Sequence, residues 1–152
     1  MSYTAPTPPS NVLDELALAA VAARVNPIKC ENGKCDYLDR SQINKLIELN
    51  ETVDGFTLLL YLVRQMSRKE WERVSGTRLY RVLNNLISNV RDIKEQQKVL
   101  RIALSYFKWF FECWELNPQN DLRKQYSNYL RNPNMQAPQG FAQTYLKTLL
   151  RI

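Results

Sequence analysis

The stretch DIKEQQKVLRIALSYFKWFFECWE, residues 92–115, is the part of the chain around which we expect the fold to be organised. Asp92 followed by Glu95 is the arrangement that caps the first turn of a helix, so a helix is predicted to begin here. Apolar side chains then recur at three- and four-residue steps, which places them on one face directed toward the core. They are Val99, Leu100, Ala103, Leu104, Phe107, Phe110, Phe111 and Trp114.

The same predicted helix carries a stripe of basic residues roughly opposite its apolar face. Lys94, Lys98, Arg101 and Lys108 follow one another at helical spacing. Two interpretations fit this stripe, because basic side chains on a helix form either an ordinary solvated face or a surface for a polyanion.

Length and composition predict a single soluble domain. A chain of 152 residues with 45% hydrophobic and 24% charged residues can build one core, and residues 11–152 are expected to form it. Residues 1–10, rich in proline and threonine, are expected to be a flexible N-terminal arm. The longest apolar run, residues 58–63, is far shorter than the roughly 20 residues that a membrane span needs. Without a signal-peptide pattern, we expect a cytoplasmic protein that does not enter a membrane.

The net charge of +6 is unevenly distributed along the chain. Residues 1–63 hold five Lys and Arg against eight Asp and Glu, which gives −3. Residues 64–116 hold eleven against six, which gives +5, and the rest of the chain adds +4. A basic excess attracts polyanions, although it does not distinguish nucleic acids from membranes or acidic proteins.

Residue types that most enzymes and metal sites need are scarce. The chain has no histidine, which excludes a histidine-based triad, a histidine base and a histidine-ligated metal. Three cysteines cannot supply a four-ligand zinc site. Glu112 and Glu115 have no nucleophile reliably placed beside them. We therefore expect no catalytic residues, no metal and no cofactor.

Helical periodicity in every long segment predicts an all-α bundle of about six or seven helices. The segment FTLLLYLVRQM, residues 56–66, is apolar nearly all round and is expected to be the central helix. A break at residues 75–77 is expected before the next helix, and Asn117 with Pro118 is expected to cap another. The remaining helices are predicted at residues 12–24, 39–53, 78–90, 92–115, 117–131 and 141–149.

The segment IKCENGKCDYL, residues 28–38, predicts a small β-hairpin between the first two helices. Its central Asn32-Gly33 suits a type I′ turn, which places Cys30 opposite Cys35. The expected Cα separation of about 4.5 Å lies within disulfide range. Free thiols, as is usual in intracellular proteins, and a disulfide both remain open.

The segment RQMSRKEWERVSGTRLYR, residues 64–81, is the strongest candidate for nucleic-acid contact. It holds six Lys and Arg against two Glu. Helical spacing would let Arg64 and Arg68, and Lys69 and Arg73, follow phosphates along a backbone. Trp71 and Trp109 are candidates for base stacking, although Trp109 could instead pack against a helix or another subunit. The candidate phosphate contacts are Arg64, Arg68, Lys69, Arg73, Arg78 and Arg81, assisted by Lys94, Lys98 and Arg101.

Three segments together resemble the small subunit of type III CRISPR interference complexes. They are SQINK at residues 41–45, the apolar helix ending in Arg64-Gln65, and YFKWFFE at residues 106–112. The resemblance implies a small helical bundle without catalytic activity, acting in archaeal antiviral defence. It points to Lys45, Arg64 and Arg68 for backbone contact, and to Phe107, Phe110 and Phe111 for the core.

The partners that the resemblance implies are guide RNA with its paired target RNA or DNA, other effector-complex subunits, and further copies of this chain in a filament. Two other classes of function fit the same sequence. One is a free-standing helical DNA-binding or viral regulatory protein, and the other is a protein interaction scaffold that does not contact nucleic acid.

Overall fold

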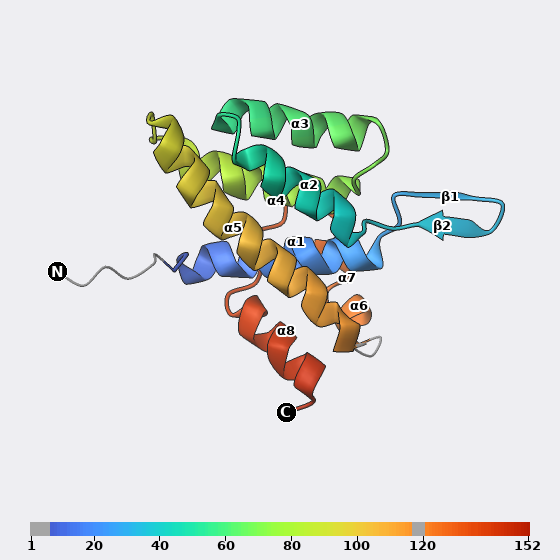
Figure 1. Ribbon diagram of the computed structural model, residues 1–152. Helices are drawn as coiled ribbons and strands as arrows, with labels where there is room; N and C mark the ends of the chain where they lie inside the picture. Colours follow the sequence, from blue (N-terminus) through green and yellow to red (C-terminus); the bar gives the residue numbers. More distant parts are fainter. Residues whose placement is uncertain (1–6, 117–120) are drawn as a thin grey trace.

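Helix α1 (Ser10–Val25) runs through the middle of the molecule and is the helix that the others surround (Figure 1). Every residue from Leu16 to Ala23 is buried, and each is at most 1% exposed. Five of these eight residues are alanines, whose small side chains let neighbouring backbones approach closely. Helices α4, α5, α7 and α8 all contact α1.

The computed structural model describes residues 7–116 and 121–152. Within these ranges the chain forms eight α-helices and one hairpin, which confirms the predicted all-α class. Residues 1–6 of the predicted arm and the predicted cap at Asn117 and Pro118 lie outside the described residues. Ser10, assigned to the arm from the sequence, already belongs to α1.

The elements follow one another from the N-terminus in the order of Figure 1. After α1 come β1 (Lys29–Glu31), β2 (Lys34–Asp36), α2 (Arg40–Asn50), α3 (Gly55–Ser67), α4 (Arg73–Ile87) and α5 (Ile93–Cys113). A short 3₁₀ turn, η1 (Trp114–Leu116), leads on to α6 (Asp121–Gln125), α7 (Ser127–Arg131) and α8 (Phe141–Leu150). The helix expected up to residue 131 is divided at Tyr126, whose ψ of 23° interrupts the helical path.

Helix α5 confirms the prediction made from residues 92–115. Asp92 accepts a hydrogen bond from the Glu95 amide at 3.0 Å and caps the helix. The buried side chains follow the predicted stripe, and the aromatic members pack ring against ring, with Phe107 stacked on Phe111 at 6.5 Å between centroids. They are Leu100, Ala103, Leu104, Phe107, Phe110 and Phe111.

Helix α3 is not the central helix, and that prediction is wrong. Leu58, Leu59 and Leu62 face the core, whereas Phe56 is 71% exposed and Leu60 is 55% exposed. A helix that is apolar all round can bury one face in the core and leave the other face exposed to contact a partner protein. The alanine-rich α1 occupies the centre because other helices can pack closely on every side of it only when its own side chains are small.

The break expected at residues 75–77 is also wrong, since α4 continues through Gly76. The chain turns earlier, at Lys69, whose φ of 56° ends the path of α3. The Glu72 carboxylate then caps α4 by accepting from the Val74 and Ser75 amides at 2.7 Å each. Gly76 instead permits close packing, because an added Cβ would lie 2.5 Å from the Met66 sulfur on α3.

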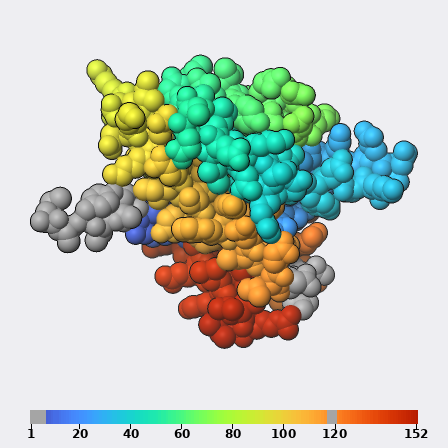
Figure 2. All heavy atoms as spheres, viewed as in Figure 1, coloured from blue at the N-terminus to red at the C-terminus, as the bar shows by residue number. Residues whose placement is uncertain are grey.

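The predicted hairpin is confirmed and projects beyond the surface of the bundle (Figure 2). Cys30 pairs with Cys35 across the two strands, and the two side chains form a disulfide. Asn32 and Gly33 adopt the positive φ angles that the type I′ turn requires. All six strand residues are exposed, so the hairpin adds nothing to the core.

The C-terminal helix is attached to α1 through a carboxylate. Asp14 is 5% exposed and accepts hydrogen bonds from the amides of Gly140 and Ala142, both at 2.9 Å. These amides are at the start of α8, so α1 supplies the N-terminal cap of a helix far along the chain. Within the described residues, no helix is long and apolar enough to cross a membrane.

Candidate nucleic-acid interface

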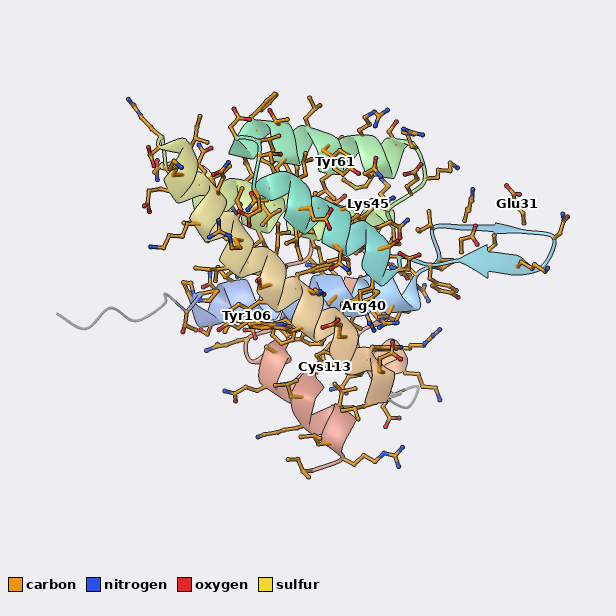
Figure 3. The ribbon with its side chains drawn as sticks, in the orientation of Figure 1. Glu31, Arg40, Lys45, Tyr61, Tyr106 and Cys113 are labelled. Atoms are coloured by element: carbon orange, nitrogen blue, oxygen red, sulfur yellow. A yellow bond between two sulfur atoms is a disulfide. The ribbon has the colours of Figure 1, made fainter. Side chains whose placement is uncertain are left out.

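Several exposed cations lie on α2, on α3 and on the connection from α3 to the start of α4, and we refer to this region as the basic corner. Gln42 on α2 donates to the Glu70 carbonyl at 2.8 Å, which holds the first turn of α2 against the connection between α3 and α4. Lys45 follows one turn later on α2, and Figure 3 shows it beside the neighbouring helix α3, which carries the labelled Tyr61. The basic corner comprises Lys45, Arg64, Arg68, Lys69 and Arg73.

Two carboxylates oppose the basic corner: Asp39, whose charge interacts with that of Lys45, and Glu70. Arg68 lies 3.5 Å from Glu70, and within the described residues the other members form no hydrogen bond or ion pair through their side chains. Glu72 is buried beneath the corner, where loss of solvent raises the pKa of its carboxyl. Lys69 and Arg73 are not on one helix as predicted, since the chain turns between them.

Arg78 cannot contact a phosphate in this fold, and that prediction is wrong. Its side chain is fully buried, with Nη1 2.9 Å from Glu15 and Nη2 bonded to the carbonyls of Tyr129 and Asn132 at 2.9 and 3.0 Å. Burial lowers the pKa of the Arg78 guanidinium, and the Glu15 carboxylate opposes that change. The residue joins α4 to α1, to α7 and to Asn132 at the end of α7.

Two further predicted contacts are already engaged within the chain. Arg81 donates to the Pro133 carbonyl and to Asn134 Oδ1. Arg101 forms a two-pronged pair with Glu51 at 2.7 and 2.8 Å, which raises the pKa of Arg101 and lowers the pKa of Glu51. Both side chains remain exposed, but a phosphate would have to displace their present partners.

The basic stripe of α5 lies apart from the basic corner. Asn50 and Gly55, at the facing ends of α2 and α3, bond to Gln97 and Gln96 near the start of α5. Arg64 and Arg68 are near the other end of α3, beside the start of α2, and α2 alone, with 11 residues, is about 16 Å long, whereas Lys45 lies at the middle of α2. Lys94, Lys98 and Arg101 therefore do not continue the surface that Arg64 and Arg68 begin.

The two candidate stacking residues have different surroundings. Trp71 is 2% exposed and stacks on Phe107 at 6.1 Å between ring centroids, so it is a core residue and its predicted stacking role is wrong. Trp109 is 55% exposed and packs edge-on against Tyr106 at 5.2 Å. It borders an apolar groove of about 330 Å³ between α5 and α8 that also includes Cys113 and Leu146.

A second groove, between α3 and α4, was not anticipated from the sequence. Its volume is about 370 Å³, and its lining combines apolar, hydroxyl, aromatic and cationic side chains. The spacing of Arg73, Thr77 and Tyr80 along one helix face could have indicated it, but only with the knowledge that α3 packs beside that face. The lining residues are Val63, Met66, Ser67, Arg73, Thr77 and Tyr80.

The carboxylates considered for catalysis form ion pairs. Glu112 lies 3.3 Å from Arg40, and Glu115 lies 2.9 Å from Arg24. In residues 7–116 and 121–152, no group of three or more His, Cys, Asp or Glu could hold a metal ion. Burial raises the pKa of Cys113, which favours the neutral thiol.

No protein-family model matches this chain, and neither the curated proteins nor the solved structures contain a match to it.

Proposed function

We propose that this protein is a non-catalytic, cytoplasmic subunit of an RNA-guided effector complex of the type III CRISPR kind. In this proposal the basic corner contacts the phosphate backbone of the guide RNA or of its paired RNA or DNA target. Neighbouring subunits, including further copies of this chain, would cover other parts of its surface. The sequence resemblance at residues 41–45, 64–65 and 106–112 supports the choice of complex.

The observation that carries the proposal is the set of exposed cations in the basic corner. Lys45, Arg64, Lys69 and Arg73 come from three helices and one turn, yet their charged groups have no carboxylate within ion-pair distance in the described structure. Such cations attract phosphates, and each contact releases condensed counterions from the nucleic acid. Base identity matters little to contacts of this kind, which suits a subunit that must accept any guide sequence.

Exposed apolar surface supports the assignment as a subunit. Phe56 and Leu60 project from α3, and Trp109 and Leu146 border the groove between α5 and α8. Figure 1 places α3 and α8 at opposite ends of the bundle. Apolar patches of this kind mark protein interaction sites, so the same feature also favours a scaffold as the second candidate function.

The test is charge reversal in the basic corner, read from the salt dependence of RNA retention. The triple variant Arg64→Glu, Arg68→Glu and Lys69→Glu should bind more weakly than the wild type. Its slope of log affinity against log salt should fall by roughly 0.7 to 0.9 for each phosphate that the variant no longer neutralises. The measurement uses the tagged chain purified with its native assembly, and also the isolated chain with single-stranded and duplex RNA.

The matched control reverses the same amount of charge elsewhere. Arg123, Lys124 and Arg131 are exposed on α6 and α7, so their change to glutamate alters net charge equally without touching the basic corner. Both variants should keep the helical circular dichroism signal. Equal binding and equal slopes for the two variants would contradict the proposal, and the scaffold function would then be favoured.

A further inference from the structure

The groove between α3 and α4 contains polar groups that the protein itself does not use. In the part of the chain that the structure describes, the Ser67 hydroxyl, the Arg73 guanidinium and the Tyr80 hydroxyl form no hydrogen bond. Thr77 Oγ1 has only the weak acceptor Met66 Sδ, at 4.0 Å. A groove with several such groups around an apolar wall has the composition of a small-ligand site.

The volume and chemistry of the lining suit one flat, polar ring. Tyr80 offers an aromatic face, and Met66 and Val63 offer apolar surface, while the Ser67 and Thr77 hydroxyls can each donate or accept a hydrogen bond. Arg73 adds a positive charge at the same groove. The volume of about 370 Å³ is near the lower limit for ligand pockets, so a single ring system fits better than a folded peptide segment.

The groove adjoins the basic corner. Arg73 belongs to both, and Ser67 immediately precedes Arg68 and Lys69 in the chain. A nucleic-acid strand with a phosphate on Arg73 would therefore pass the opening of the groove. The groove between α5 and α8 lacks this combination, because its lining holds no charged side chain.

We propose that the groove between α3 and α4 binds one nucleotide unit, with an unpaired base against Tyr80 and Met66 and the adjacent phosphate on Arg73. The Ser67 and Thr77 hydroxyls would bond to the edge of the base. This inference rests on the proposed function, and it adds a base-stacking site to a surface otherwise described by phosphate contacts. Stacking on an aromatic ring tolerates any base, so the site remains compatible with varied guide sequences.

The test separates base contacts from phosphate contacts. Fluorescence anisotropy compares a single-stranded oligoribonucleotide with an abasic chain of the same length and phosphate number. The wild-type protein should bind the base-bearing strand about 5- to 100-fold more tightly than the abasic chain. Tyr80→Leu should abolish this difference and leave the slope against salt unchanged, since the phosphate contacts remain.

Two further variants test whether the change in the affinity difference between the two strands is specific to the groove. Tyr61→Leu changes another half-buried tyrosine, on α3, whose ring does not line the groove, so it should retain the difference between the two strands. Thr77→Val keeps the shape of the side chain and removes only the hydroxyl, so it should reduce the difference even if Tyr80→Leu proves unstable. Melting temperature and helical signal are compared for all three.

Photo-crosslinking locates the bound base. Competition with a free nucleotide shows whether the natural ligand of the groove is a nucleic-acid strand or a mononucleotide. A strand that carries 4-thiouridine should crosslink to the peptide containing Tyr80. Displacement of that strand by AMP at low concentration would identify a free nucleotide as the natural ligand of the same groove. A crosslink to Trp109 instead would overturn the inference.

The possible failures are distinguishable. Equal affinity for the base-bearing and abasic strands, with the salt slope still dependent on Arg64 and Arg68, would overturn the nucleotide site and leave the proposed function intact. Failure of both strands to bind would overturn both proposals.

Discussion

Arg78 is the residue on which several parts of the fold depend. It pairs with Glu15 of α1 and donates to the carbonyls of Tyr129 in α7 and of Asn132 just after it, all within 3.0 Å. Arg78→Met should keep most of the side-chain volume but leave the Glu15 carboxylate without its cationic partner, with only the Ala137 amide still donating to it. Removing one member of a buried pair costs about 3 to 5 kcal/mol, and urea unfolding at neutral pH measures it.

Arg81→Met is the control for that prediction. Arg81 also bonds to the segment after α7, but it is exposed, so its removal should cost at most about 1 kcal/mol. Equal decreases of stability in the two variants would show that burial of Arg78 is not what gives the pair its effect.

Glu72 should make stability depend on pH. Burial raises the pKa of its carboxyl above the ordinary value of 4.5, although the Ser75 and Val74 amides oppose this change. The folded state thus holds the proton more tightly than the unfolded state, and this contribution to the free energy of unfolding falls as pH rises from about 4.5 through the raised pKa.

The comparison with Glu72→Gln isolates that effect. The variant cannot titrate at this position, so the unfolding free energy of the wild type minus that of the variant should decrease between pH 4 and 7. Denaturant titrations at several pH values provide the difference. An increase with pH would mean that the two amide bonds outweigh the cost of burial.

Single residues also show what the sequence could and could not reveal. Charge and spacing identified Arg64, Arg68 and Arg78 equally, because all three are basic residues in one segment. Which of them faces solvent depends on Glu15, a partner 63 positions away from Arg78. Tertiary pairing of this kind leaves no local signal, so the sequence overestimated the number of free cations.

At the scale of elements, α1 shows that a helix with small side chains can form the centre of the bundle. Ala20 lies in the middle of the run that is buried on all sides. Ala20→Leu should force α4 and α5 away from α1 or drive side chains into strained rotamers, at a cost of roughly 1 to 3 kcal/mol. Chemical denaturation measures this decrease in stability.

Thr144→Leu is the control for that substitution. Thr144 is exposed on α8, and the change should alter stability by no more than about 0.5 kcal/mol. A variant Ala20→Leu as stable as the wild type would show that space remains beside α1.

Helix caps and turns could be predicted from the sequence, because they depend on interactions between residues close together in the chain. The cap at Asp92 and the turn at Asn32-Gly33 each depend on residues close in sequence, and both are present in the structure. Which helix lies at the centre of the bundle could not be predicted from residues close together in sequence. Hydrophobicity favoured residues 56–66, whereas the packing of neighbouring backbones selected the alanines of α1.

At the scale of the whole molecule, the helices should unfold together while the hairpin unfolds on its own. Contacts of α1 reach from α4 to α8, so calorimetry should show one transition with equal calorimetric and van't Hoff enthalpies. The six exposed strand residues lie outside this unit. Cys30→Ser with Cys35→Ser should therefore shift the melting midpoint by no more than about 1 °C.

The size of the shift in the melting midpoint shows whether the hairpin unfolds together with the helices. If the hairpin belonged to the cooperative unit, opening its short disulfide loop would cost roughly 2 kcal/mol and lower the midpoint by roughly 4 to 8 °C. Arg78→Met serves as the positive control, because it perturbs the unit itself. Two separate calorimetric transitions would also contradict the prediction from sequence that residues 11–152 form one domain.

The bonds from Asp14 to the start of α8 have a consequence for how the protein is made. Their partners lie 126 and 128 positions later in the chain, so they emerge from the ribosome long after α1. Until then α1 has its alanine-rich surface only partly covered, and the carboxylate that will cap α8 remains hydrated. We expect the packing around α1 to be completed only after α8 has been synthesised, since contacts this distant in sequence form slowly.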